Sequence, residues 1–156
     1  MTLTLGQPTG RKPPFKFSAL TRVGFSDTDA QGIVYYGRYL PYFDHARVEY
    51  QRELGLLVVA LGPCEFVMRA SHVVYEAPAR FDDLLEVFVR TRRLGRTSIT
   101  DEYAVYRVED DVLMCTAEET LVLVDLAERR PAPIPEEYRR PVEEFEGADL
   151  EEPVAR

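Results

Sequence analysis

The sequence is poor in the side chains that most often bind metals. Its 156 residues include two cysteines and two histidines, and both tryptophan and asparagine are absent. Cys64 and Cys115 lie far apart, and only His45 and His72 could join them. Structural zinc sites need four Cys or His ligands at characteristic spacings. We therefore expect no metal site, and we expect both cysteines to be buried, reduced thiols.

The sequence also lacks a long hydrophobic run. Its longest apolar stretch, residues 54–61, is much shorter than the roughly 20 residues that a membrane-spanning helix requires. Residues 1–16 contain no apolar segment of the kind found in signal peptides. These absences predict a protein without membrane insertion and with a cytoplasmic location.

Positive charge is scarce as well. The chain has 27 acidic and 19 basic residues, which gives a formal net charge of -8 and a pI of about 4.9. Such a field repels phosphate backbones and anionic membrane surfaces, so we expect no nucleic-acid partner. An anionic small molecule would need a local cluster of arginines to offset the overall charge.

The remaining composition is that of one globular domain. Hydrophobic residues make up 46% of the chain and charged residues 29%, and the length suffices for a single core. Residues 1–14 contain glycine and proline without periodicity and predict a flexible leader. We expect the folded domain to span residues 15–135. Residues 136–156 predict a short acidic helix followed by a disordered tail.

Hydrophobic periodicity predicts one long helix after a first strand at residues 15–25. A polar, turn-rich break covers residues 26–32. From Leu40, apolar side chains recur every three or four residues and form one stripe of a helix. The stripe consists of Leu40, Phe43, Ala46, Tyr50, Leu54 and Leu57.

The second half of the chain alternates with the period of β-strands. Four segments are rich in Val, Tyr, Thr and Phe, namely residues 65–75, 84–94, 97–108 and 112–125. Their short connections favour antiparallel pairing. The sequence therefore predicts an α+β fold in which an antiparallel sheet of about five strands wraps around one long helix. Because such a sheet has open edges, we expect a homodimer or a homotetramer.

Two acidic residues lie in the loop before the helix. The segment F-S-D-T-D-A-Q-G places Asp27 and Asp29 near Gly32, which permits close approach of a ligand to the backbone. Main-chain N–H groups at a helix start can stabilise an oxyanion, and a carboxylate can activate water or attack a carbonyl. Acidic residues before helices more often serve as caps. The residues alone leave both interpretations open.

A longer pattern adds a specific resemblance. Residues 22–50, which include G-F-S-D-T-D-A-Q-G-I-V-Y-Y-G-R-Y, resemble the 4-hydroxybenzoyl-CoA thioesterase family and its YbgC-like branch of acyl-CoA thioesterases. Residues 66–86 and the segment L-G-R-T-S at residues 94–98 are similar to the same branch, so the resemblance covers most of residues 17–135. It implies a hot-dog fold, with active sites formed between two protomers.

The resemblance also implies roles for individual residues. In the pattern D-x-x-G-x-V, Asp29 corresponds to the catalytic carboxylate, with Asp27 as its supporting neighbour, and the main-chain N–H of Tyr36 to the oxyanion donor. Residues expected to contact the acyl-CoA substrate are Asp27, Gly32, Ile33, Val34, Arg96, Thr97 and Ser98. No separate cofactor is implied, since coenzyme A is part of the substrate. YbgC-like members commonly carry histidine at the position of Tyr36, and this departure affects the expected acyl preference.

Other functions and residues compete with this assignment. A hydratase or dehydratase acting on acyl thioesters, or a non-catalytic acyl-CoA-binding module, could share the fold. Arg90, Arg92 and Arg93 could bind phosphate or form a solvated strand face. Glu49 is a reserve catalytic carboxylate, and structural roles are expected for both histidines. Residues 56–61 could line an acyl pocket, although core packing is the favoured interpretation.

Overall fold

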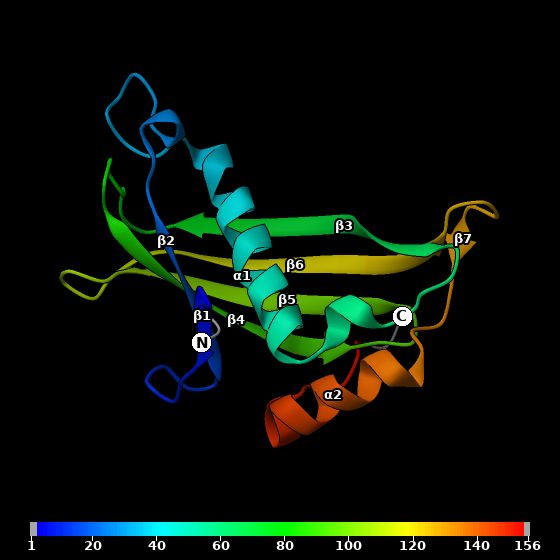
Figure 1. Cartoon of the computed structure of the whole chain (residues 1–156). Coiled ribbons are helices and arrows are strands. Elements are labelled where there is room, and N and C mark those ends of the chain that lie inside the picture. Colours follow the sequence, from blue (N-terminus) through cyan, green and yellow to red (C-terminus); the bar gives the residue numbers. More distant parts are fainter. Residues whose placement is uncertain (1–2, 155–156) are drawn as a thin grey trace.

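The protein consists of a twisted antiparallel sheet with a long helix packed across one face (Figure 1). The structure, a computed structural model, describes residues 3–154. The strand order is β1-β2-β4-β5-β6-β3, and β7 pairs with β6. The predicted α+β fold is thus confirmed. Residues 1, 2, 155 and 156, which belong to the predicted leader and tail, lie outside the described residues.

The sheet contains seven strands rather than about five. Four are long, namely β3 (Cys64–Tyr75), β4 (Leu84–Leu94), β5 (Ser98–Arg107) and β6 (Val112–Asp125), and the shorter ones are β1 (Gly6–Pro8), β2 (Phe17–Arg22) and β7 (Arg130–Pro131). The prediction was too low because β1 and β7 are too short to show alternation. Each also contains a proline, which normally argues against a strand.

Two helices and four short 3-10 turns complete the fold within residues 3–154. The helices are α1 (Tyr39–Glu53) and α2 (Glu136–Glu146), and the turns are η1 (Phe25–Asp27), η2 (Tyr36–Arg38), η3 (Leu56–Val58) and η4 (Gly147–Asp149). Phe43 of α1 is fully buried and stacks on Tyr103 of β5 with ring centroids 4.7 Å apart. Burial of one such side chain stabilises the fold by about 1.5–3 kcal/mol. The predicted stripe is confirmed at Phe43, Ala46 and Tyr50 and is wrong at Leu40 and Leu57, which are exposed.

Both end segments take part in the fold, whereas the sequence predicted a flexible leader and a disordered tail. β1 pairs with β2, which places Gly6 opposite Ala19. After α2, the main-chain N–H of Glu151 donates to the carbonyl oxygen of Arg92 (2.8 Å). Short segments without periodicity can still dock when a sheet edge offers unpaired N–H and C=O groups.

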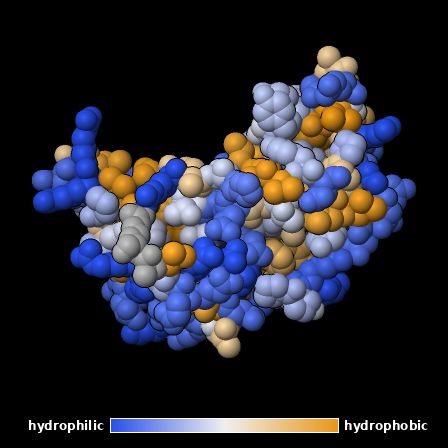
Figure 2. Space-filling model, turned by 180° about the vertical axis from the view of Figure 1, so that it is seen from behind, coloured by the Kyte–Doolittle hydropathy of each residue, from blue (hydrophilic) through white to orange (hydrophobic). Residues whose placement is uncertain are grey.

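Strand β3 forms one edge of the sheet and is exposed along its length. None of its twelve residues is buried, and Val67, Met68, Val74 and Tyr75 are each more than a third exposed. Seen from behind, hydrophobic patches lie toward the upper side of the molecule, where β3 runs, and the middle of the face is largely hydrophilic (Figure 2). An exposed edge of this kind favours pairing with another strand.

No helix in residues 3–154 has the length and hydropathy needed to cross a membrane. In the same part of the chain, no group of three or more His, Cys, Asp or Glu side chains is arranged to hold a metal ion.

Candidate active site

Asp29 lies in a tight turn between β2 and α1. Its main-chain N–H donates to the carbonyl oxygen of Ile33 (3.0 Å), and the N–H of Gly32 donates to the carbonyl oxygen of Asp29 (3.0 Å). The carboxylate atom Oδ1 accepts the N–H of Gln31 (2.8 Å). Gly32 has a φ of +77°, a conformation that glycine adopts at little cost. The turn therefore fixes the half-buried carboxylate of Asp29 in one orientation.

Asp27 anchors the base of the same loop. Its Oδ2 accepts the main-chain N–H of Gly24 and the hydroxyl of Tyr42, both at 2.8 Å. The Nε atom of Arg38 lies 3.8 Å from Oδ1. Burial and the Asp27 carboxylate raise the pKa of Tyr42, so its hydroxyl remains a donor. These contacts attach the loop to α1 and support a positioning role for Asp27.

Tyr36 begins the helical segment that leads into α1. Within residues 3–154, its main-chain N–H donates to no protein acceptor. First-turn N–H groups of helices commonly lack partners and carry partial positive charge. The hydroxyl of Tyr75 donates to the carbonyl oxygen of Tyr36 (2.9 Å) and holds the residue against the end of β3. The free N–H of Tyr36 is thus available to an oxyanion.

Asp29 and Tyr36 line one pocket with a volume of about 420 Å³. The pocket lies between the Asp29 loop, the start of α1 and the segment after β3, and its other lining residues are Gln31, Ile33, Val34, Tyr39, Tyr75, Glu76, Ala77 and Pro78. Burial raises the pKa of Tyr39 to about 12, so this phenol stays neutral near pH 7. The pocket combines the carboxyl side chain of Asp29 with largely apolar walls, and its lining includes Tyr36, whose N–H donates to no protein acceptor within residues 3–154.

The structure brings together part of the predicted site and adds residues to it. Asp29, Ile33, Val34 and Tyr36 line the pocket, whereas exposed Gly32 shapes the turn and Asp27 lies below it. The residues missed from the sequence include 75–78, which come from the other side of the pocket. They fall within residues 66–86, the second segment that carries the family resemblance, so that segment held the signal.

Arg96, Thr97 and Ser98 lie at the opposite end of the sheet. Ser98 begins β5, whereas Val105 of β5 pairs with Cys115, which in turn pairs with Tyr75. Val105 is seven positions after Ser98, which corresponds to about 23 Å along a strand. Within one protomer, these three residues therefore do not meet Asp29.

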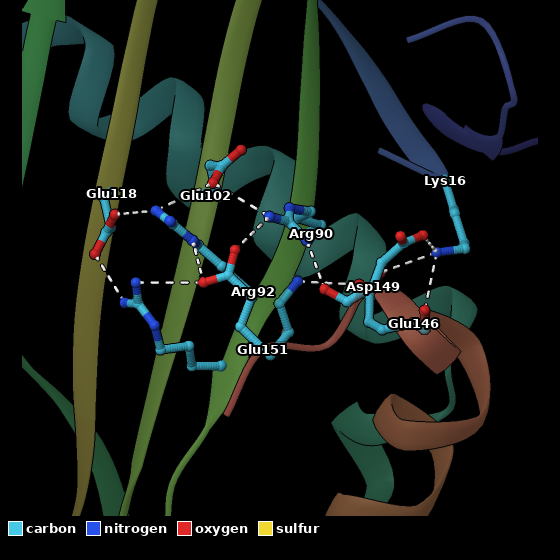
Figure 3. A network of polar contacts seen from close by, with 10 residues as sticks. Lys16, Arg90, Arg92, Glu102, Glu118, Glu146, Asp149 and Glu151 are labelled. Atoms are coloured by element: carbon cyan, nitrogen blue, oxygen red, sulfur yellow. Dashed lines mark hydrogen bonds and ion pairs between the residues drawn. The ribbon is translucent and has the colours of Figure 1, made fainter. Parts of the chain in front are cut away.

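The arginines of β4 form an ion-pair network on the outer face of the sheet (Figure 3). Arg92 contacts Glu118 at 2.7 Å and Glu151 at 3.0 Å, and Arg90 is 5% exposed. Arg93 contacts Glu118 and Glu151 as well. Neither a phosphate site nor a solvated face describes this arrangement, because the guanidinium groups are engaged with carboxylates of the same chain.

The remaining sequence candidates have structural contacts. His45 Nε2 lies 3.0 Å from the carbonyl oxygen of Leu20, which supports the structural role expected for this histidine. Glu49 is ion-paired with Arg52 at 2.6 Å. Asp44 and Arg47 form an i,i+3 ion pair on α1 at 2.8 Å. None of these four residues lines the pocket that contains Asp29.

The pocket has the elements required for acyl transfer. A carboxylate can take a proton from water or attack a carbonyl carbon, and a fixed N–H stabilises the resulting oxyanion. An acyl group bound against the apolar walls would displace water and strengthen these interactions. Neither histidine lines the pocket, so among the described residues Asp29 and Glu76 are the only carboxyl side chains in its lining.

Comparisons with known proteins identify the family. A family model described as the thioesterase-like superfamily matches residues 23–142. Acyl-CoA thioesterase YbgC of Haemophilus influenzae is 32% identical over 126 residues, which cover 79% of this chain and 91% of that protein. A probable thioesterase from Bartonella henselae is 30% identical with a TM-score of 0.66, covering 76% of this chain and 96% of the other.

The fold comparison extends to more distant structures. The 1,4-dihydroxy-2-naphthoyl-CoA thioesterase from Synechocystis superposes with a TM-score of 0.74 at 22% identity and covers 80% of this chain and 93% of that chain. The helix wrapped by an antiparallel sheet is therefore a hot-dog fold, as the resemblance predicted. Together with the family match and the loop that carries Asp29, these similarities show that the chain belongs to the thioesterase-like superfamily.

Proposed function

We propose that the protein hydrolyses the thioester of an aliphatic or aromatic acyl-CoA to the free acid and coenzyme A. One observation carries the proposal, namely that Asp29 lines the same pocket as Tyr36, whose main-chain N–H has no protein acceptor within residues 3–154. The names of the related YbgC proteins, which are acyl-CoA thioesterases, support the same substrate class. The reaction uses no separate cofactor.

The proposed mechanism assigns one step to each group. Asp29 acts either as a general base, taking a proton from the attacking water, or as a nucleophile, forming a mixed anhydride that water then hydrolyses. In both cases the carbonyl oxygen gains negative charge, which the N–H of Tyr36 stabilises. The C–S bond then breaks, and the coenzyme A thiolate leaves and takes up a proton.

We further propose that the active form is at least a homodimer, paired through the exposed edges of β3. The apolar side chains on that edge and the absence of buried residues along β3 support this arrangement. Antiparallel pairing around a two-fold axis would place the end of one β3 against the start of the other. In such a dimer, the sheet end that carries Arg96 in one protomer would lie on the same side of the dimer as the Asp29 pocket of the other protomer.

Arg96, Thr97 and Ser98 are proposed to contact the nucleotide part of the coenzyme A from the partner. Arg96 is exposed, and within residues 3–154 it forms no ion pair, unlike the arginines of β4. An unpaired guanidinium suits phosphate oxygens. This placement meets the need for local positive charge on a protein with a net charge of -8.

A thiol-release assay over short, long and aromatic acyl-CoAs tests the proposed function. We expect turnover of at least one class, with loss of turnover in Asp29→Asn. Water addition to an enoyl-CoA without thiol release would instead identify a hydratase. Tight binding of acyl-CoA without either reaction would identify a non-catalytic binding module.

A further inference from the structure

Three tyrosine rings line the pocket that contains Asp29. Tyr36 and Tyr39 come from the segment that begins α1, and Tyr75 is the last residue of β3. The rings of Tyr39 and Tyr75 pack edge to face, with centroids 5.6 Å apart. Tyr75 also bonds through its hydroxyl to the carbonyl oxygen of Tyr36 (2.9 Å). The three residues therefore form one connected aromatic wall.

Two of these rings are accessible to a ligand. Tyr36 is 63% and Tyr75 48% exposed, whereas Tyr39 is buried. Burial raises the pKa of Tyr75 above its usual value, so this phenol is neutral near pH 7. The face of an aromatic ring carries partial negative charge and attracts a cation within about 6 Å of the ring centre. Walls of several aromatic rings are a common way in which proteins bind a quaternary ammonium group.

The ionisable groups of the pocket favour a cation as well. Asp29 and Glu76 supply two carboxyl groups, and across residues 3–154 no lysine, arginine or histidine contributes to the lining. Arg38, two residues after Tyr36, lies 3.8 Å from the carboxylate of Asp27 and does not line the pocket. Carboxyl groups without a neighbouring cation attract positive charge, and more strongly once a ligand displaces water.

Glu76 is held at the pocket by its main chain. Its N–H and that of Ala77 both donate to the carbonyl oxygen of Met114, at 2.8 and 3.1 Å. Its side chain is exposed, so the carboxyl group can rotate toward a bound group. Asp29 is assigned to the hydrolysis itself. Glu76 is therefore the carboxyl group of the pocket that is free to bind a cation on the acyl group.

The rest of the lining suits a cation that carries methyl groups in place of N–H donors. The pocket has a volume of about 420 Å³, within the range of small-molecule pockets, and four of its lining residues are aliphatic or proline, namely Ile33, Val34, Ala77 and Pro78. A primary ammonium would lose hydrogen bonds to water against such walls. A trimethylammonium group makes no such bonds, so it can be buried there while keeping its charge.

We propose that the pocket selects acyl-CoA substrates whose acyl group carries a quaternary ammonium, bound against the rings of Tyr36 and Tyr75 and beside Glu76. The inference rests on the proposed function and names the class of acyl group. An acyl group ending in a carboxylate would be repelled by the two carboxyl groups. A hydrocarbon of the same shape would be buried equally well but would gain no attraction to the rings or to Glu76.

Three acyl-CoAs of matched length test the selectivity, namely 4-(trimethylammonio)butanoyl-CoA, 5,5-dimethylhexanoyl-CoA and glutaryl-CoA. The first two have the same shape and differ in having a cationic nitrogen or a neutral carbon at the branch point. We expect kcat/KM for the cationic substrate to exceed that of each of the others by about fivefold or more, the effect of a partly desolvated cation–π contact. A smaller ratio of the cationic to the neutral substrate would overturn the proposal.

Variants of Tyr75 separate the ring from its hydroxyl. Tyr75→Phe keeps the aromatic face and should keep the cationic-to-neutral preference, although loss of the bond to Tyr36 lowers both rates. Tyr75→Leu removes the aromatic face and should reduce the preference to about twofold or less. The preference is a ratio measured on one protein sample, so a smaller folded fraction does not change it. Full preference in Tyr75→Leu would contradict the role of the ring.

Glu76→Gln tests the contribution of charge. It should lower the cationic-to-neutral preference by about twofold, as expected for an exposed charge. It should also raise kcat/KM for glutaryl-CoA relative to the neutral substrate. Glu128→Gln is the matched control, because it removes the same charge from an exposed turn, where Glu128 pairs with Arg130 at 3.5 Å outside the pocket. Equal shifts in the two variants would reflect net charge and contradict a local role for Glu76.

Failure of this inference can be distinguished from failure of the proposed function. Thioether analogues of the three acyl-CoAs, in which a methylene replaces the thioester carbonyl, can be titrated by calorimetry whether or not the protein is active. Tighter binding of the cationic analogue that Tyr75→Leu abolishes would support the selectivity even without hydrolysis. Hydrolysis of the three substrates combined with equal binding of their analogues would retain the proposed function and refute the selectivity for a cation.

Discussion

The hydroxyl of Tyr75 donates a hydrogen bond of 2.9 Å to the carbonyl oxygen of Tyr36. This contact joins the last residue of the edge strand β3 to the first residue of the helical segment before α1. It holds in place the residue whose N–H is proposed to stabilise the oxyanion. Because β3 is also the proposed dimer edge, the contact links the interface to the catalytic pocket.

Removal of this hydroxyl should affect the rate more than the stability. Tyr75 is partly exposed, so Tyr75→Phe should lower the free energy of unfolding by no more than about 1 kcal/mol. A loosened Tyr36 N–H should lower kcat by about tenfold, a fraction of the hundredfold or greater effect of losing an oxyanion donor. Steady-state kinetics and denaturant unfolding measure the two effects. An unchanged kcat would show that the contact does not position the donor.

Replacement of the catalytic carboxylate should remove turnover without unfolding the loop. Asparagine keeps the side-chain oxygen that accepts the N–H of Gln31, so Asp29→Asn should retain the turn. Loss of a general base or nucleophile should lower kcat by about a hundred- to ten-thousandfold. Asp111→Asn is a matched control, because that residue forms an exposed ion pair with Lys12 outside the pocket. Full activity in Asp29→Asn would disprove the assigned role.

Isotope labelling separates the two roles of Asp29. In a single turnover in H₂¹⁸O, a general base delivers labelled oxygen directly to the product acid. With a nucleophile, water attacks the mixed anhydride, and attack at the Asp29 carbonyl leaves the label in the enzyme. Mass spectrometry of the protein after one turnover should therefore detect ¹⁸O in the peptide containing Asp29 if Asp29 is the nucleophile and water attacks its carbonyl, and this result would exclude the general-base route.

The left-handed conformation of Gly32 should make this position sensitive to substitution. A Cβ at Gly32 meets no neighbour within 4 Å, so the cost of Gly32→Ala comes from its φ of +77° alone. That cost is about 1–2 kcal/mol, and relaxation of the turn should displace Asp29 and lower kcat. Gly10→Ala is the control, because Gly10 also has open space but no positive φ. Thermal unfolding and steady-state kinetics should show a lower stability and a lower kcat for Gly32→Ala than for Gly10→Ala.

The buried acid Asp101 should make stability depend on pH. Its pKa is about 7 in the folded protein and 3.8 as a free side chain, so the folded state binds the proton more tightly. The stabilisation from protonated Asp101 is full below about pH 4 and is lost as the pH rises through 7. Asp101→Asn removes this loss and should raise the urea midpoint more at pH 8 than at pH 5. If the difference in urea midpoint between Asp101→Asn and the wild type were the same at both pH values, burial would not raise the pKa of Asp101.

The sequence by itself specified the elements whose signal is local. Spacings of three and four residues placed Phe43, Ala46 and Tyr50 on the buried side of α1, and alternation located β3, β4, β5 and β6 to within one or two residues. The pattern of acids and glycine before the helix identified the turn around Asp29, because a tight turn with a positive φ depends on neighbouring residues.

Tertiary structure decided what depends on residues distant in the chain. Strand pairing alone places residues 75–78 in the same pocket as Asp29. It also places Arg96 at the other end of the sheet. The arginines of β4 resembled a phosphate site in sequence, yet Glu118 and Glu151 neutralise them. Likewise, Arg47 and Asp101 line one cavity because α1 packs across β5, and no local pattern encodes that approach.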